Sequence, residues 1–140
     1  MLEKIFKKNK NKQENDIILV SSLLVHAARI DENYTEVERK IIKKAIMDLN
    51  QIDIIEAEEI LKNAEKKEEE SNQIIEFTKE IKKSSMEFRY KIIEILWKIV
   101  YSDRASDMYE SNLIRRVCGL LYVSNKDSGK IRLKVQNLKQ

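Results

Sequence analysis

Apolar residues recur along most of the chain with the three- and four-residue spacing that places them on one face of an α-helix. The clearest runs occupy residues 17–28, 41–49 and 92–100. Several runs are preceded by Ser, Thr or Asp with an acidic residue three positions later. This is the spacing of a capping box, in which the two side chains accept hydrogen bonds from backbone N–H groups at the helix start. The pairs are Thr35 with Glu38, Asp53 with Glu56, Ser84 with Glu87, Asp107 with Glu110 and, more weakly, Ser124 with Asp127.

These patterns predict an all-α fold, a compact bundle of about seven helices joined by short loops. The chain has no Pro and only two Gly among its 140 residues, which suits helices. The same composition disfavours β-sandwiches, barrels and Gly-rich nucleotide loops. The expected helices span residues 15–31, 36–49, 53–68, 72–83, 85–102, 108–122 and 125–138.

The chain contains an internal repeat. Residues 24–42 read LVHAARIDENYTEVERKII, and residues 96–114 read LWKIVYSDRASDMYESNLI. In this alignment Asp31 matches Asp103 and Glu38 matches Glu110, and each unit reads as helix, short acidic loop, helix. The repeat predicts two pseudo-symmetric helix-loop-helix units whose acidic loops lie near each other.

The candidate metal ligands are the four carboxylates of the two units, Asp31, Glu38, Asp103 and Glu110. An Asp at the C-terminal end of a helix meets the negative end of the helix dipole, so the loop N–H groups or a bound cation should offset that cost. Oxygen ligands favour Ca²⁺, Mg²⁺ or Mn²⁺. An EF-hand is excluded, because Glu36 stands at the required Gly and Ile42 at the bidentate Glu.

A metal-free alternative stays open for the same carboxylates. Glu38 and Glu110 stand at capping-box positions, which accounts for them without a ligand. Arginines elsewhere in the chain are the other rival to a cation, because they could pair with the loop carboxylates. These arginines are Arg89, Arg115 and Arg116.

Two blocks of the sequence resemble the TerB-like family, a small helical domain named after tellurite-resistance proteins and similar to the N-terminal region of DjlA-type co-chaperones. The blocks are ARIDENYTEVERKII and EFRYKIIEILWKIVYSDRASDMYESNLIRRVCGLLYVS, and the resemblance spans about residues 17–127. It implies a non-enzymatic cytoplasmic domain of the tellurite- or stress-resistance type that acts with protein partners. It also implies a divalent cation at the acidic loops. The family usually has Gly after each motif Asp, where this chain has Glu32 and Arg104, so we expect any binding to be weak.

Charge divides the chain into an acidic body and two basic ends. Residues 1–13 hold five Lys and one Glu, residues 126–140 hold four Lys, one Arg and one Asp, and residues 14–125 hold more acidic than basic residues. This distribution disfavours nucleic-acid binding, which needs basic residues gathered on the body. We divide the chain into a basic leader at 1–13, flexible or amphipathic, and a TerB-like domain at 14–140. The leader lacks the uninterrupted apolar core of a signal peptide, which favours the cytoplasm.

Within the leader, Met1, Leu2, Ile5 and Phe6 share a helical face between lysines. Contact of residues 1–8 with an anionic membrane surface is an alternative that we do not favour, because two turns bind weakly.

For four other single residues the sequence predicts structural roles. We expect Trp97 and Tyr101 to anchor the core, Cys118 to be a small buried residue, and His26 to lie on a polar face. With one His, one Cys and no phosphate loop, an enzyme is the disfavoured class.

Overall fold

The computed structural model describes residues 2–30, 33–71, 73–102 and 108–138, and describes side chains at 16–30, 33–71, 73–102 and 112–138. Within these ranges the chain forms seven α-helices and no strand. This confirms the predicted all-α bundle, whereas the pseudo-symmetry of the two units stays a prediction. The helices are α1 (Leu2–Arg29), α2 (Glu36–Asn50), α3 (Ile54–Glu70), α4 (Ile74–Ile81), α5 (Met86–Ser102), α6 (Met108–Leu120) and α7 (Asn125–Leu138).

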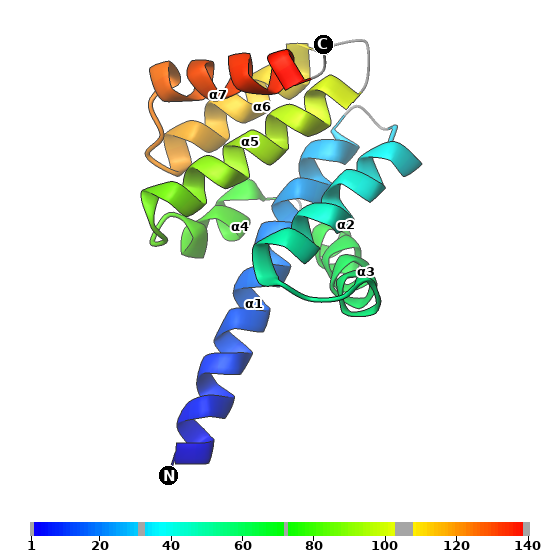
Figure 1. Ribbon diagram of the computed structural model, residues 1–140, viewed down its shortest axis with the longest axis vertical. Coiled ribbons are helices and arrows are strands. Elements are labelled where there is room, and N and C mark those ends of the chain that lie inside the picture. Colours follow the sequence, from blue (N-terminus) through cyan, green and yellow to red (C-terminus); the bar gives the residue numbers. More distant parts are fainter. Residues whose placement is uncertain (1, 31–32, 72, 103–107, 139–140) are drawn as a thin grey trace.

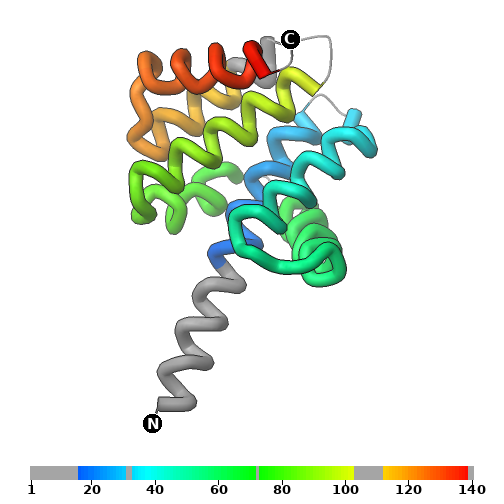
Figure 2. The backbone as a smooth tube through the Cα atoms, in the orientation of Figure 1, coloured from blue at the N-terminus to red at the C-terminus, as the bar shows by residue number. Residues whose placement is uncertain are grey.

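Helices α1 and α5 hold the bundle together (Figure 1). Helix α1 packs against α2, α3, α4 and α5, and α5 packs in addition against α2, α6 and α7. Figure 2 shows α5 and α7 side by side on one side of the molecule and α2 and α3 on the other. The fold therefore has an α1–α2–α3 half and an α5–α6–α7 half, with α4 packed between α1 and α6.

One core cluster of buried apolar side chains runs through both halves. Leu24 of α1 and Leu96 of α5 are fully buried, and Phe77 of α4 fills the space beside α1. The prediction that Trp97 and Cys118 are buried is confirmed, since they are 6% and 1% exposed. Removal of this apolar surface from water is the main source of the stability of the bundle.

The helix starts follow the capping predictions with one correction. The Thr35–Glu38 capping box is confirmed, and Asp53 accepts a hydrogen bond from the backbone N–H of Glu56. At α5 the predicted cap, Ser84, is wrong by one position: Ser85 precedes the helix, and its hydroxyl accepts from the backbone N–H of Phe88 at 3.2 Å. The Ser84 hydroxyl instead donates to the backbone carbonyl of Ile81 at the end of α4, which leaves Ser85 as the cap of α5. The Asp107–Glu110 pair lies outside the described side chains.

The first helix begins earlier than the predicted start at residue 15. Helix α1 is continuous from Leu2 to Arg29. The segment before residue 15 contains no Pro or Gly and holds five Lys and two Glu, which are good helix formers. The helix therefore extends beyond the amphipathic run that predicted it. The division into a leader and a domain stays a prediction.

Candidate functional site

Of the four predicted metal ligands, Glu38 is the one whose side chain the structure describes. Asp31 and Asp103 lie outside the described residues, and the side chain of Glu110 lies outside the described side chains. The described ends of α1 and α5 and the start of α2 lie at the same end of the bundle in Figure 1. The two acidic loops begin from these helix ends. We call this region the loop end.

Glu38 is a buried capping residue. Its carboxylate Oε1 accepts hydrogen bonds from the backbone N–H of Thr35 at 2.9 Å and from the Thr35 hydroxyl at 3.0 Å. The Thr35 hydroxyl in turn accepts from the backbone N–H of Glu38 at 3.1 Å. The residue is only 1% exposed. A carboxylate at the positive end of α2 is stabilised by the helix dipole as well as by these bonds.

Arg89 does not have the partner that the sequence suggested. Its guanidinium donates to the backbone carbonyl of Leu121 at 2.7 Å and to that of Ser85 at 3.4 Å. It therefore joins the start of α5 to the end of α6, at the other end of α5 from the loop that carries Asp103. Arg115 and Arg116 are exposed side chains of α6.

A network of ion pairs joins α3 to α1 and α2, and the sequence did not predict it. Arg39 donates to both carboxylate oxygens of Glu58, at 2.6 and 3.1 Å, and to Glu65 at 3.1 and 3.2 Å. Arg29 pairs with the buried Glu68 at 2.7 Å. Glu58, Glu65 and Glu68 are spaced by seven and three residues on α3. That spacing, which puts three acids on one helix face, is the signal that could have found the network.

Three groups in this region have shifted pKa values. Hydrogen bonds to Glu58, and then to Glu65, raise the pKa of the Arg39 guanidinium. Hydrogen bonds from Arg39, and then from Lys43, lower the pKa of Glu58 to about 2, so its carboxylate is ionised at every physiological pH. Burial is the main cause that raises the pKa of Tyr34, which stays a neutral phenol beneath the Arg29 guanidinium, 5.1 Å above its ring. His26 contacts the buried Glu68 at 3.2 Å and lies beside the Phe77 ring, with ring centroids 6.3 Å apart, so it has a polar partner but is mostly covered and does not lie on an open polar face.

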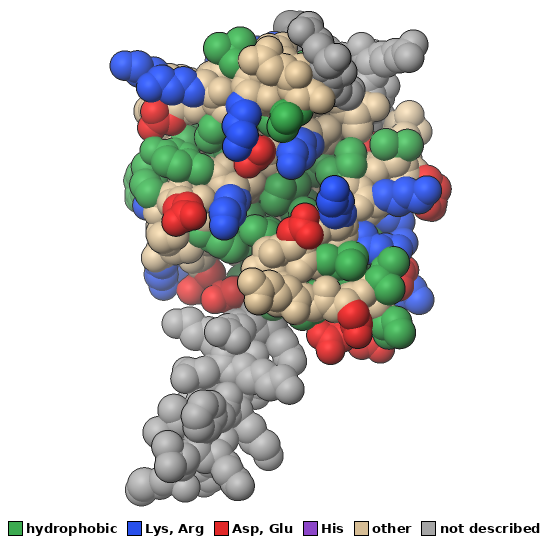
Figure 3. Space-filling view, viewed as in Figure 1, with side chains coloured by type: hydrophobic (Ala, Val, Ile, Leu, Met, Phe, Trp, Pro, Cys, Tyr) green, Lys and Arg blue, Asp and Glu red, His purple; other side chains and the backbone are tan. Residues whose placement is uncertain are grey.

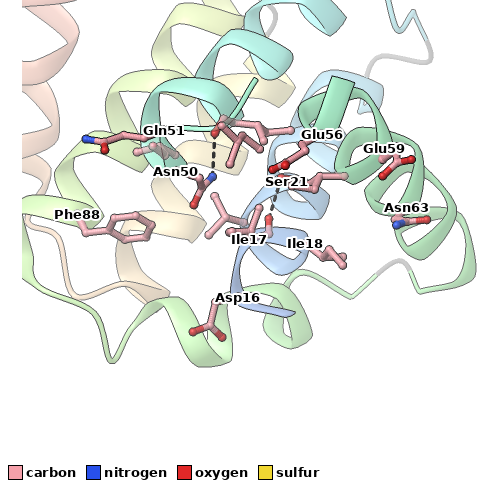
Figure 4. Close-up of a pocket in the computed structure, with 15 residues that line it drawn as sticks. Asp16, Ile17, Ile18, Ser21, Asn50, Gln51, Glu56, Glu59, Asn63 and Phe88 are labelled. Atoms are coloured by element: carbon pink, nitrogen blue, oxygen red, sulfur yellow. Dashed lines mark hydrogen bonds between the residues drawn. The ribbon is translucent and has the colours of Figure 1, made fainter. Parts of the chain in front are cut away.

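A groove of about 800 Å³ lies beside the middle of α1 and the end of α2, away from the loop end. Figure 4 shows it between residues 16–21 of α1, the end of α2, and α3, with Phe88 of α5 at one side. Asp16, Glu56 and Glu59 are its charged lining residues. Its apolar lining includes Ile17, Ile18, Val20, Ile46, Ile52 and Ile60. Below, the groove means this cavity and its lining residues. Neither the repeat nor the capping pattern predicted it.

The donor chemistry of the loop carboxylates suits a hard cation, since all four are oxygen ligands. In the part of the chain whose side chains are described, no group of three or more His, Cys, Asp and Glu is arranged to hold a metal ion. One oxygen of Glu38 is already engaged by Thr35. A site at the loop end would therefore depend chiefly on Asp31, Asp103 and Glu110.

The fold defines a small helical-bundle module with acidic interhelical loops. The family model described as Tellurite resistance protein TerB matches residues 18–133, and the chain belongs to this family. Comparisons with curated proteins and with solved structures gave no significant match. Among the described helices, none is long and apolar enough to cross a membrane.

Proposed function

We propose that the chain is a non-enzymatic TerB-family module that binds a divalent cation weakly at the loop end and acts with protein partners. The observation that supports the cation is the position of the described ends of α1, α2 and α5 at one end of the bundle. The matched region, 18–133, includes both acidic loops. Loops that start from neighbouring helix ends can combine their carboxylates around one ion.

The residues that would hold the cation are Asp31 and Glu38 from one unit and Asp103 and Glu110 from the other. Carboxylates brought close repel one another, and a cation relieves that repulsion. Glu32 and Arg104 stand where Gly would let loop carbonyls turn toward the ion, and Arg104 adds a positive charge. We expect dissociation constants of about 10⁻⁴–10⁻³ M, the range of weak Ca²⁺ modules.

The second candidate is a metal-free interaction module in which the carboxylates are structural. The hydrogen bonds of Glu38 favour it, because a buried carboxylate that closes a capping box needs no cation. The non-enzymatic part of the proposal is common to both candidates. It is supported by the engagement of His26 with Glu68 and by the burial of Cys118, which leave neither side chain open to a substrate.

Titration of the chain with Ca²⁺, Mg²⁺ and Mn²⁺, followed by NMR and calorimetry, tests the two candidates. The cation candidate predicts saturable shifts near the loop end, tighter binding in Arg104→Gly, and loss of binding in the Asp31→Asn, Asp103→Asn double variant with helicity unchanged. The absence of binding at millimolar cation in both wild type and Arg104→Gly would leave the metal-free module.

The substitution Glu38→Gln separates capping from ligation at one residue. Gln also serves at this position of a capping box, so its amide oxygen keeps the acceptor while the negative charge is removed. If Glu38 is a ligand, the variant should bind the cation several-fold more weakly at nearly unchanged thermal stability. If Glu38 is only a cap, cation binding should be unchanged.

A further inference from the structure

The groove is an apolar surface with an acidic rim. Its lining side chains Ile17, Ile52 and Ile60 are only partly buried although they pack against the core. Two of its neutral polar side chains are already engaged: the Ser21 hydroxyl donates to the Ile17 carbonyl and the Asn50 amide to the Ile46 carbonyl (Figure 4). Gln51 and Asn63 also line the groove. The groove therefore offers an occupant apolar contact, carboxylates and two side-chain amides.

The charge of the rim is uncompensated within the described structure. Asp16, Glu56 and Glu59 are the charged lining residues, and none of the three has an ion-pair partner among the described residues. In Figure 3 several acidic side chains lie along the lower edge of the viewed face. Such a surface fits a basic amphipathic helix, whose apolar face enters the groove while its cations meet the rim.

The chain itself contains a segment of this chemistry. Residues 1–13 hold five Lys and one Glu, and Leu2, Ile5 and Phe6 have the spacing of one helical face. The segment cannot enter the groove of its own molecule, because α1 is one continuous helix from Leu2 to Arg29 and Asp16 belongs to the same helix. Folding back would require a break in α1 immediately before the groove.

We propose that the groove binds residues 1–13 of a second copy of this chain. Each copy has one groove and one segment, so two copies can exchange segments in a closed two-fold dimer with two equivalent contacts. The Lys side chains would compensate the three rim carboxylates, and Leu2, Ile5 and Phe6 would cover the apolar lining. The groove lies beside the middle of α1 and at the opposite end of α2 from the first acidic loop, so this dimer does not depend on the proposed cation site.

The test is the oligomeric state of the full chain, measured by sedimentation equilibrium at low and high salt. We expect a concentration-dependent dimer that high salt weakens, because exposed charge pairs are screened. The double substitution Glu56→Lys, Glu59→Lys should weaken the dimer at least about tenfold. Both positions are exposed, so the fold should survive. Glu36→Lys with Glu70→Lys changes the net charge equally on exposed sites away from the groove and should leave the dimer intact.

Charge exchange makes the test specific to this pair of surfaces. Lys7→Glu with Lys8→Glu should also weaken the dimer, and combination with Glu56→Lys, Glu59→Lys should restore it. The proposal would be overturned if the chain were monomeric at all accessible concentrations. It would also be overturned if the rim substitutions left the stability of the dimer unchanged. A monomer recruited by vesicles of anionic lipid through residues 1–13, with no effect of the rim substitutions, would also overturn it and assign the segment to a membrane surface.

Discussion

The two halves of the bundle are joined by different chemistry. In the α1–α2–α3 half, charged contacts cross between helices: Arg39 bridges Glu58 and Glu65, and Arg29 pairs with Glu68. The α5–α6–α7 half also has an ion pair between helices, Lys134 with Glu94 at 3.4 Å, but its α5–α7 contact is centred on an aromatic pair of α5. Trp97 donates from its indole N–H to Ser128 at 3.1 Å and stacks on Tyr101, with ring centroids 6.0 Å apart.

An Arg side chain takes part in the helix contacts of each half, but the groups that it contacts differ. Arg132 of α7 lies 4.9 Å from the Trp97 ring centroid and donates to the Tyr101 hydroxyl at 2.6 Å, so it covers an aromatic pair. Arg39 instead lies between two carboxylates. Partly exposed ion pairs contribute little each, whereas a buried aromatic side chain excludes a large area from water. The α5–α7 contact should therefore depend on burial, and the α2–α3 contact on pH and salt.

Among the substitutions that test the two halves, Trp97→Ala should lower the free energy of unfolding most. Truncation of a buried Trp removes its apolar contacts and leaves a cavity, and we expect the free energy of unfolding to fall by about 3–5 kcal/mol. Urea denaturation followed by circular dichroism measures it. Leu133→Ala, at a residue of α7 that is 59% exposed, is the matched control and should change little. A Trp97→Ala variant as stable as wild type would contradict the assigned role of the aromatic contact.

Ser128→Ala should cause the next largest decrease in the free energy of unfolding. Ser128 is 5% exposed and accepts the indole N–H of Trp97, so its loss leaves a buried donor without that acceptor. The expected loss of stability is about 1–3 kcal/mol. In a Trp97→Phe background, where there is no indole N–H, the same substitution should cost clearly less. Equal costs in the two backgrounds would show that the hydrogen bond contributes nothing.

The sequence predicted the parts of the fold that depend on local pattern. Helix periodicity located all seven helices, and the Thr35–Glu38 spacing identified a capping box that the structure contains. Burial of Trp97 and Cys118 followed from their position on apolar helix faces. Local pattern failed at Ser84, whose hydroxyl bonds to the Ile81 carbonyl at the end of α4 while Ser85 caps α5.

The candidate site was less predictable, because its contacts join distant parts of the chain. The pairing of Arg39 with Glu58 and Glu65 depends on the packing of α3 against α2, which no short motif encodes. The groove likewise arises where α1, α2 and α3 meet. Of the predicted ligands, Glu38 could be recognised because capping is a local interaction; the roles of Asp31, Asp103 and Glu110 stay predictions.

The smallest expected effect concerns the pH dependence of the charged half. The pKa of Glu58 is about 2 in the folded chain because Arg39 and Lys43 hold its carboxylate ionised, whereas an ordinary Glu titrates near 4.5. The contribution of Glu58 to stability is therefore fully present above about pH 4.5 and is lost as the pH falls toward 2. Because the side chain is 28% exposed, solvent screening reduces this contribution to about 1 kcal/mol.

Denaturation of wild type and Glu58→Gln at several pH values measures this contribution directly. The variant should be less stable by about 1 kcal/mol at neutral pH, and the two stabilities should converge as the pH falls through 2, where Glu58 becomes protonated in the folded chain as well. Glu59→Gln is the matched control, since Glu59 is the exposed neighbour on α3 without an ion-pair partner among the described residues, and its difference from wild type should not change with pH. A constant gap between wild type and Glu58→Gln from pH 7 to 2 would mean that Glu58 stabilises α3 by packing alone. The charged half would then depend on burial as the aromatic half does.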